Sequence, residues 1–294
     1  MKYAQLFLIN AFFPAAMPQS LTANDKRHDD LVAAFQDWAT ENHVSNAAIV
    51  LTDAKGFTSR SVDHEVGLAG RDNAFDLASH GKAITAICTA VLFEEGLSSP
   101  ETTPRDVLGY SPEGITVAQL LTHISGLNTD MTQLMMVFWV SNQTRRWQFV
   151  TQTAYADACT PPALEPAGVT SARVSSLIGT TLPWDGWRMT RDDHPAFLRH
   201  WFGTEGLIGQ RPQYWQHATV SGPVEDGMDM FQARVDGKTD FWHFGVWCTG
   251  NVLSTGRHAT TWQGNISAVA ACETCIDDRV TRALRRAMDE GARQ

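Results

Sequence analysis

The stretch FDLASHGKAITAICTAVLFEEG, residues 75–96, carries the pattern on which the fold assignment depends. From Ser79 to Glu95 it is apolar on nearly all sides and it stops at Gly96, which predicts a helix buried by its neighbours with a glycine C-cap. Ser79 and Lys82 lie three residues apart at the start of this helix, so both side chains share one face. A lysine can activate a serine when burial and nearby cations keep part of it neutral. The short spacing alone is weak evidence, because it arises easily by chance.

A second block, ITVAQLLTHISGL at residues 115–127, follows about twenty residues later and predicts a short buried helix from Val117 to Leu121. Together the two blocks resemble the penicillin-recognising serine hydrolases: class C beta-lactamases, family VIII esterases and D-alanyl-D-alanine carboxypeptidases. Two long matches in the right order are far more specific than the serine–lysine spacing. The resemblance runs from about residue 31 to residue 288. It implies an α+β fold of the beta-lactamase/transpeptidase type, with an antiparallel sheet flanked by helices and a helical subdomain.

The hydrophobic periodicity of the other segments agrees with one sheet built from both ends of the chain. Helical spacing occurs at 25–41, 192–201 and 277–288, and strand-like runs occur at 47–52, 57–62, 240–248 and 265–271. We expect the last two runs to pair with each other. The predicted organisation is a signal peptide over residues 1–20 and a single domain over 21–294, with the sheet part at about 25–75 and 235–294 and the helical part at about 76–234.

The composition excludes several classes of protein. With 43% hydrophobic and 19% charged residues the chain is an ordinary folded protein, which rules out disorder and collagen. Its 23 basic and 32 acidic residues give a net charge of −9, which repels phosphate backbones, so we expect no nucleic-acid partner. No uninterrupted apolar run reaches the roughly 20 residues of a membrane span. We therefore expect no membrane span, and nothing in the sequence indicates a cofactor.

The N-terminal twenty residues carry one basic residue, Lys2, and then an apolar segment from Ala4 to Met17. This pattern suits a secretory signal, although no clean small-x-small cleavage site follows it. We therefore expect a periplasmic or secreted protein. The alternative is an N-terminal strand or helix packed on the core of a cytoplasmic protein.

The family resemblance implies a role for individual residues. Ser79 becomes the acylated nucleophile and Lys82 its proton acceptor. The family's third motif is a basic residue or histidine, a variable residue and a glycine on the edge strand beside the site, and we place it on His258, Ala259 and Thr260. A threonine in place of the glycine would narrow the cleft, which argues against ordinary beta-lactam binding. The oxyanion hole would use the backbone N–H of Ser79 and one near Thr260.

The family's second motif, a tyrosine, a variable residue and an asparagine, is absent. Counted back from residues 177–179, its positions fall on Thr170, Ser171 and Ala172. Tyr155 is a candidate to replace the tyrosine by turning into the cleft, and an ordinary structural role is the alternative. Losing a general acid or base typically costs about 10²–10⁴ in rate, so slow acylation remains feasible. The expected substrate-binding residues are His258, Thr260, Thr170 and Tyr155.

Two functions follow from these assignments. The first is a serine hydrolase that cleaves a small-molecule ester or amide through an acyl-Ser79 intermediate; a peptidoglycan-handling carboxypeptidase is a subdivision of it that depends on export. The alternative is a catalytically impaired pseudoenzyme that keeps the fold and acts as a binding or regulatory module. The sequence does not specify the oligomeric state.

Five cysteines are too few and too scattered for a disulfide scaffold. Cys272 and Cys275 form a CxxC, for which a metal site, a local disulfide and plain packing are the alternatives. Zinc needs four ligands and no second pair lies at ligand spacing, so we expect no metal. His194 and His200 are six residues apart on different helical faces, and we expect both on the surface.

Overall fold

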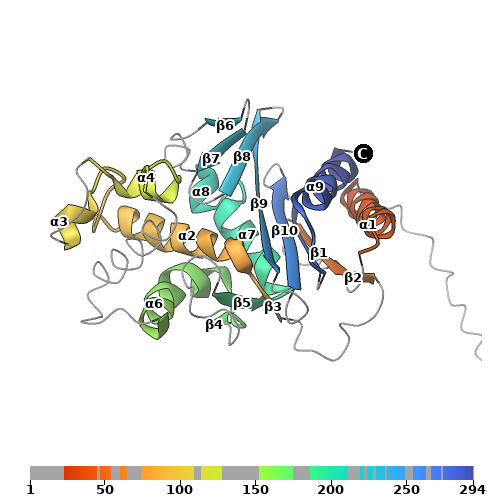
Figure 1. The fold of residues 1–294 in the computed structure, drawn as a ribbon, viewed down its shortest axis with the longest axis horizontal. Coiled ribbons are helices and arrows are strands. Elements are labelled where there is room, and N and C mark those ends of the chain that lie inside the picture. The colour runs from red at the N-terminus through yellow and green to blue at the C-terminus, as the bar shows by residue number, and fades with distance from the viewer. Residues whose placement is uncertain are drawn as a thin grey trace, which may run out of the picture.

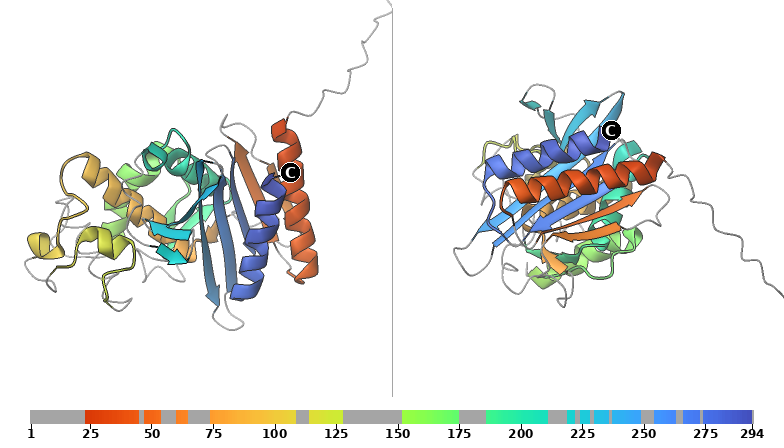
Figure 2. Two further views of the ribbon diagram at one scale, coloured as in Figure 1. Left: turned by 90° about the horizontal axis from the view of Figure 1, so that it is seen from above. Right: turned by 90° about the vertical axis from the view of Figure 1, so that its right-hand side faces the viewer.

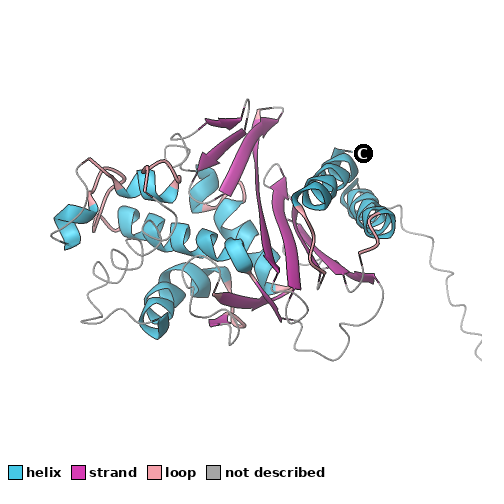
Figure 3. Cartoon of the chain, viewed as in Figure 1, coloured by secondary structure: helices cyan, strands magenta, loops and turns pink. Residues whose placement is uncertain are grey.

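The structure of the protein, a computed structural model, describes residues 23–44, 47–53, 60–64, 74–108, 114–127, 152–174, 186–210, 219–221, 224–227, 230–235, 237–248, 254–262, 266–272 and 274–293. They form an eight-stranded antiparallel sheet with helices on both faces (Figure 1). This arrangement confirms the predicted α+β fold. Figure 3 shows how the helices gather into one large group on one side of the sheet and a pair on the other. Among the described helices, none combines the length and apolarity that a membrane crossing requires.

The sheet takes strands from both ends of the chain, in the order β2-β1-β11-β10-β9-β8-β7-β6. The strands are β1 (Ala47–Asp53), β2 (Arg60–His64), β6 (Thr219–Ser221), β7 (Val224–Gly227), β8 (Met230–Val235), β9 (Lys238–Cys248), β10 (Ser254–Trp262) and β11 (Ile266–Cys272). The expected pairing of 240–248 with 265–271 is wrong, because β10 lies between β9 and β11 and pairs with both. β10 has the sequence STGRHATTW, whose polar residues give no sign of an interior strand.

Two helices from opposite ends of the chain cover one face of the sheet: α1 (Ala23–Glu41) and α9 (Asp278–Arg293). They lie side by side (Figure 2). A Cβ atom at Gly291 of α9 would lie 2.9 Å from the carbonyl oxygen of Asp30, so glycine allows the helices to approach closely. The indole of Trp38 donates a hydrogen bond to the carbonyl oxygen of Val280 at 3.1 Å. Fully buried apolar side chains join both helices to the sheet, among them Leu31, Phe35, Ile49, Leu284 and Met288.

The other face carries the helical part of the protein. It consists of the 3-10 helix η1 (Ala78–His80), α2 (Gly81–Glu94), α3 (Pro104–Leu108), α4 (Val117–Leu121), α6 (Gln152–Cys159), the π-helix η2 (Thr160–Leu164), the 3-10 helix η3 (Glu165–Ala167), α7 (Asp193–Phe202) and α8 (Leu207–Gln210). α2 is buried along most of its length, as its apolar sequence predicts. α4 begins with a capping box in which Thr116 and Gln119 exchange hydrogen bonds.

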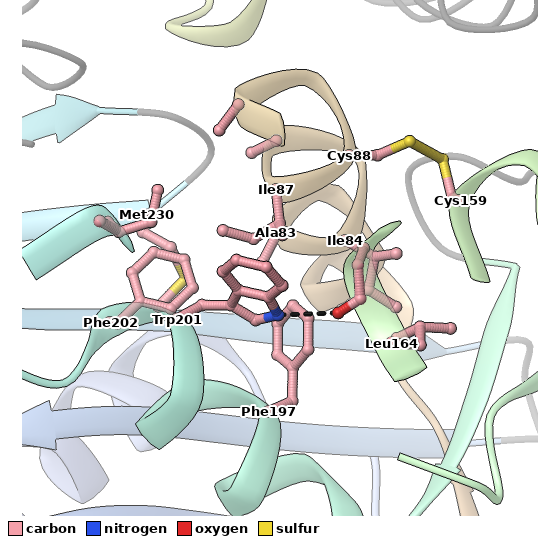
Figure 4. Close-up of a cluster of buried hydrophobic side chains, with 14 of the residues drawn as sticks. Ala83, Ile84, Ile87, Cys88, Cys159, Leu164, Phe197, Trp201, Phe202 and Met230 are labelled. Carbon is pink, nitrogen blue, oxygen red and sulfur yellow. Dashed lines mark hydrogen bonds between the residues drawn. A yellow bond between two sulfur atoms is a disulfide. The ribbon is translucent and has the colours of Figure 1, made fainter. Parts of the chain in front are cut away.

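The core of this helical part is built on α2 (Figure 4). Ile84 and Ile87 of α2 are fully buried, as is Phe197 of α7. The indole of Trp201 lies in the same cluster and donates a hydrogen bond to the carbonyl oxygen of Ala163 at 2.7 Å. This bond satisfies a buried donor and fixes α7 against η2.

A small second sheet, which the sequence did not indicate, leads into η1. It has the order β3-β5-β4, with β3 at Ala74–Asp76, β4 at Arg173–Val174 and β5 at Trp187–Thr190. The guanidinium of Arg188 donates to the carbonyl oxygen of Ala74 at 2.6 Å. The strand directly before Ser79 is therefore anchored to chain that lies more than a hundred residues later.

A disulfide joins Cys88 of α2 to Cys159 of α6 (Figure 4). Cys275 is also disulfide-bonded, whereas Cys272 is a buried thiol outside any disulfide. The suggested local bond between Cys272 and Cys275 is therefore wrong. The Cys88–Cys159 bond instead links two segments that lie 71 residues apart in the sequence.

Candidate active site

Ser79 and Lys82 lie where η1 passes into α2, and both are half-buried. The backbone turns sharply just before Ser79, since Ala78 has a φ of +48°. This left-handed conformation costs an alanine roughly 1–2 kcal/mol. One residue earlier, the backbone N–H of Leu77 donates to the carbonyl oxygen of Trp187 at 2.8 Å. The small sheet thus supports a strained turn that presents Ser79 and Lys82 together.

The strand that borders Ser79 is β9. A Cβ atom at Gly245 would lie 2.7 Å from the carbonyl oxygen of Leu77 and 3.1 Å from the backbone nitrogen of Ser79. A side chain at this position would therefore collide with the backbone of η1. Because Gly245 has no side chain, the backbone N–H of Ser79 can lie directly beside β9.

Alternation along β9 places His243 on the same face as Gly245. On the helical face, the ring of Phe241 contacts that of Phe202 at 5.5 Å and the ring of His243 contacts that of His80 at 5.2 Å. On the opposite face, Trp242 lies 3.9 Å below the guanidinium carbon of Arg285 on α9. His243 therefore points toward the turn that carries Ser79 and His80.

The imidazole of His243 is held neutral. Burial lowers its pKa from the ordinary value of 6.5 to about 3, and the charges of Lys82 and His123 lower it further in the same direction. Its Nδ1 atom is fully buried, and the ring stacks on that of Phe231 at 5.6 Å. No carboxylate in the described part of the chain forms an ion pair with His243. A backbone hydrogen bond at Phe244 acts in the other direction and raises the pKa, but burial outweighs it.

His243 is one end of a row of three histidines. The ring of His80 contacts His243 at 5.2 Å and His194 at 5.0 Å, both edge to face. His80 and His194 are each only 1% exposed. The expectation of a surface His194 is therefore wrong, because α7 packs this face against η1; His200, on another face of α7, is exposed.

The structure does not bring His258 and Thr260 to the site. Both lie on β10, where His258 pairs with Phe244 and Thr260 pairs with Trp242. Partners across an antiparallel pair share a face of the sheet, so these two register positions belong to the face that α1 and α9 cover. The pattern of histidine, variable residue and glycine occurs instead on β9, at residues 243–245. Its intact glycine is a signal in the sequence that our placement of the motif on residues 258–260 overlooked.

Thr170 lies in the turn between η3 and β4, and it is exposed. Its backbone N–H donates to a carboxylate oxygen of Asp193 at 2.9 Å. The same oxygen accepts the N–H of Ser171 at 2.8 Å and its hydroxyl at 2.6 Å. The hydroxyl of Ser171 also accepts the backbone N–H of Thr190 at 2.9 Å. The positions of the absent second motif thus form a hydrogen-bonded anchor between this turn and α7.

Tyr155 belongs to α6. Its side chain lies outside the described part of the structure. The disulfide between Cys88 and Cys159 ties α6 to α2. Tyr155 is therefore on a helix fixed to the one that begins beside Ser79, and its role remains a prediction.

Asp193→Ala is expected to lower the free energy of unfolding by about 2–3 kcal/mol, because three donors lose one charged acceptor. Urea titration of the variant measures this loss. Asp192→Ala, which removes the exposed carboxylate of the preceding residue, is the matched control and should have a smaller effect. Equal stability of the two variants would show that the turn at 170–171 does not depend on Asp193.

Comparison with known proteins supports the fold. Residues 28–160 match the family model Beta-lactamase. No curated protein matches the chain in sequence. The fold is similar to that of a D-stereospecific amidohydrolase from Streptomyces sp., with a TM-score of 0.70 and 14% identity over 89% of this chain and 98% of the other.

Two further solved structures give the same result. A penicillin binding protein from Bacillus halodurans has a TM-score of 0.66 and 16% identity, over 88% of this chain and 98% of that one. A class C beta lactamase from Rhodobacter sphaeroides has a TM-score of 0.64 and 14% identity, over 90% of this chain and all of that one. Residues 28–160 thus match the Beta-lactamase family model, and the chain as a whole shares the fold of these three structures.

Proposed function

We propose that the protein is a serine hydrolase that cleaves an ester or amide through an acyl-Ser79 intermediate. The observation that carries the proposal is the close approach of Ser79 to Gly245. It places the backbone N–H of the nucleophile beside a strand whose own N–H groups can complete an oxyanion hole. Such donors are each worth roughly 2.7–4 kcal/mol and do not depend on side-chain identity.

The proposed reaction has two steps. In the first, the oxygen of Ser79 bonds to the acyl carbon, its proton passes to the neutral amine of Lys82, and the leaving group departs with that proton. In the second, water gives a proton to Lys82 and bonds to the acyl carbon, and the ester bond to Ser79 breaks as the serine takes the proton back. The acid is released and both residues return to their starting state.

The third motif is proposed to lie on β9 as His243, Phe244 and Gly245, in place of His258, Ala259 and Thr260. β9 borders Ser79, and its glycine is required by the packing of η1. The altered glycine that argued against ordinary beta-lactam binding is then no obstacle, because Thr260 is on the neighbouring strand. The absent tyrosine remains the main departure from the family pattern.

Ser79→Ala is expected to abolish covalent labelling, because it removes the nucleophilic oxygen. Intact-mass spectrometry after incubation with a fluorophosphonate, and separately with a penicillin, measures the adduct. Ser99→Ala, a half-buried serine in the turn after α2, is the matched control and should be labelled like the unaltered protein. Labelling that persists in Ser79→Ala would overturn the proposal.

The second candidate is a pseudoenzyme of the same fold that binds a ligand or partner. The hydrogen bonds of Thr170 and Ser171 favour this candidate. The positions expected for the second motif bind the carboxylate of Asp193 and so stabilise the fold, rather than contributing a catalytic side chain. Absence of any adduct on the unaltered protein, together with a folded state by circular dichroism, would favour this candidate over the hydrolase.

The disulfides support an oxidising location. Cys88–Cys159 joins two buried helices, and Cys275 is disulfide-bonded as well. Such bonds persist mainly in secreted, periplasmic and surface proteins. We therefore propose a periplasmic or secreted protein, and protease accessibility in intact and permeabilised cells distinguishes this from a cytoplasmic one.

A further inference from the structure

The side chain that β9 directs toward the nucleophile is a histidine with no charge. His243 is two residues before Gly245, which lies against the backbone of Ser79. Its ring is enclosed by those of His80 at 5.2 Å and Phe231 at 5.6 Å. The charged groups that act on it, Lys82 of α2 and His123 after α4, are both basic. No carboxylate of the described residues pairs with it to offset them.

A neutral imidazole offers an anionic substrate no ion pair. It can donate or accept a hydrogen bond. A carboxylate moved from water to a position beside His243 would nevertheless lose hydration without gaining a cationic partner there. The protein as a whole carries a net charge of −9, which also disfavours the approach of anions.

Lys82 gives a second reason. The proposed reaction needs its neutral amine to accept the proton of Ser79. A substrate carboxylate nearby would stabilise the ammonium form and raise the pKa of Lys82, which removes the base. His243 has no such effect, because an uncharged neighbour does not stabilise the ammonium form.

We propose that His243 makes this a site for uncharged acyl groups, so that the natural substrate is a neutral ester or amide without a carboxylate near the cleaved bond. This inference rests on the proposed function and narrows its substrate class. It assigns His243 a role in specificity, and it assigns His80 and His194 the role of enclosing its ring.

Two esters of one shape test the proposal. Ethyl butyrate and monoethyl succinate differ by a terminal methyl against a carboxylate, and they share a leaving group too poor to be expelled by that carboxylate without the enzyme. We expect kcat/KM to favour the butyrate by at least about tenfold. The ratio should stay constant between pH 5.5 and 8, because kcat/KM follows the ionisation of groups in the free enzyme, which is the same for both esters, and His243 stays neutral throughout this range.

Two variants of His243 distinguish the effect of its charge on ester preference from the effect of changing its side chain. His243→Lys places a cation on β9 and is expected to reduce the preference for butyrate at least about tenfold. His243→Gln keeps the position neutral and should retain the preference even if both rates fall. The ratio in the unaltered protein and its pH dependence test the proposal without either variant, should His243→Lys not fold.

The outcomes distinguish this inference from the proposed function. Ser79-dependent hydrolysis that favours the succinate, or a preference that disappears below pH 6.5, would overturn the inference and leave the serine hydrolase standing. No Ser79-dependent reaction with either ester or with the fluorophosphonate would overturn both. A constant preference for the butyrate that only His243→Lys reduces would establish the inference.

Discussion

Gly245→Ala is expected to lower the rate of Ser79 acylation by about 10²–10³-fold, which is the cost of losing one oxyanion donor. The added methyl group would lie 2.7 Å from the carbonyl oxygen of Leu77 and 3.1 Å from the backbone nitrogen of Ser79, so η1 has to move away from β9. The backbone N–H of the nucleophile would leave its place beside the strand. Stopped-flow measurement of fluorophosphonate labelling gives the rate.

Gly291→Ala is the matched control for this change. It introduces the same methyl group at an equally tight place, 2.9 Å from the carbonyl oxygen of Asp30, but between α9 and α1 on the other face of the sheet. Both variants should lose thermal stability, and only Gly245→Ala should lose acylation at a temperature where both are folded. Equal labelling rates for the two would show that the oxyanion hole does not involve β9.

Cys88→Ser combined with Cys159→Ser is expected to lower the free energy of unfolding by about 4 kcal/mol. The disulfide closes a loop of 71 residues, and a loop of that length loses about this much conformational freedom in the unfolded chain. Guanidinium titration without reductant measures the loss. The midpoint should fall while the slope of the transition rises, because the unfolded chain can expand further.

Cys272→Ala is the control for the disulfide variant, because it removes a buried sulfur that is not part of a disulfide. We expect it to cost about 1 kcal/mol. The double variant should also label more slowly at Ser79, since α2 would no longer be tied to α6 beside the site. Stability equal to that of Cys272→Ala would contradict the structural role of the Cys88–Cys159 bond.

Local patterns determined the elements of the fold that hold the nucleophile. The run from residue 81 to 94 is apolar on all sides, and only a helix enclosed by others can bury such a surface, as α2 does. Ser79 and Lys82 come together because residues three positions apart in a helix lie on the same face. No contact with a distant segment is needed for that. The acidic start and basic end of the last helix likewise predicted α9.

Tertiary structure alone decided what surrounds these residues. Two strands, β9 and β10, each contain a histidine and could each border Ser79. Alternation along a strand fixes the faces of its side chains but not which strands are its neighbours. The crossover order of the sheet puts β9 there and places His258 on the strand beyond. The burial of His194 and the disulfide between Cys88 and Cys159 could not be predicted from the sequence either. Both depend on contacts between segments that lie far apart in the chain. The sequence alone therefore predicted the candidate nucleophile and base, which are local, while long-range packing decided which strand, histidine and cysteine complete their surroundings.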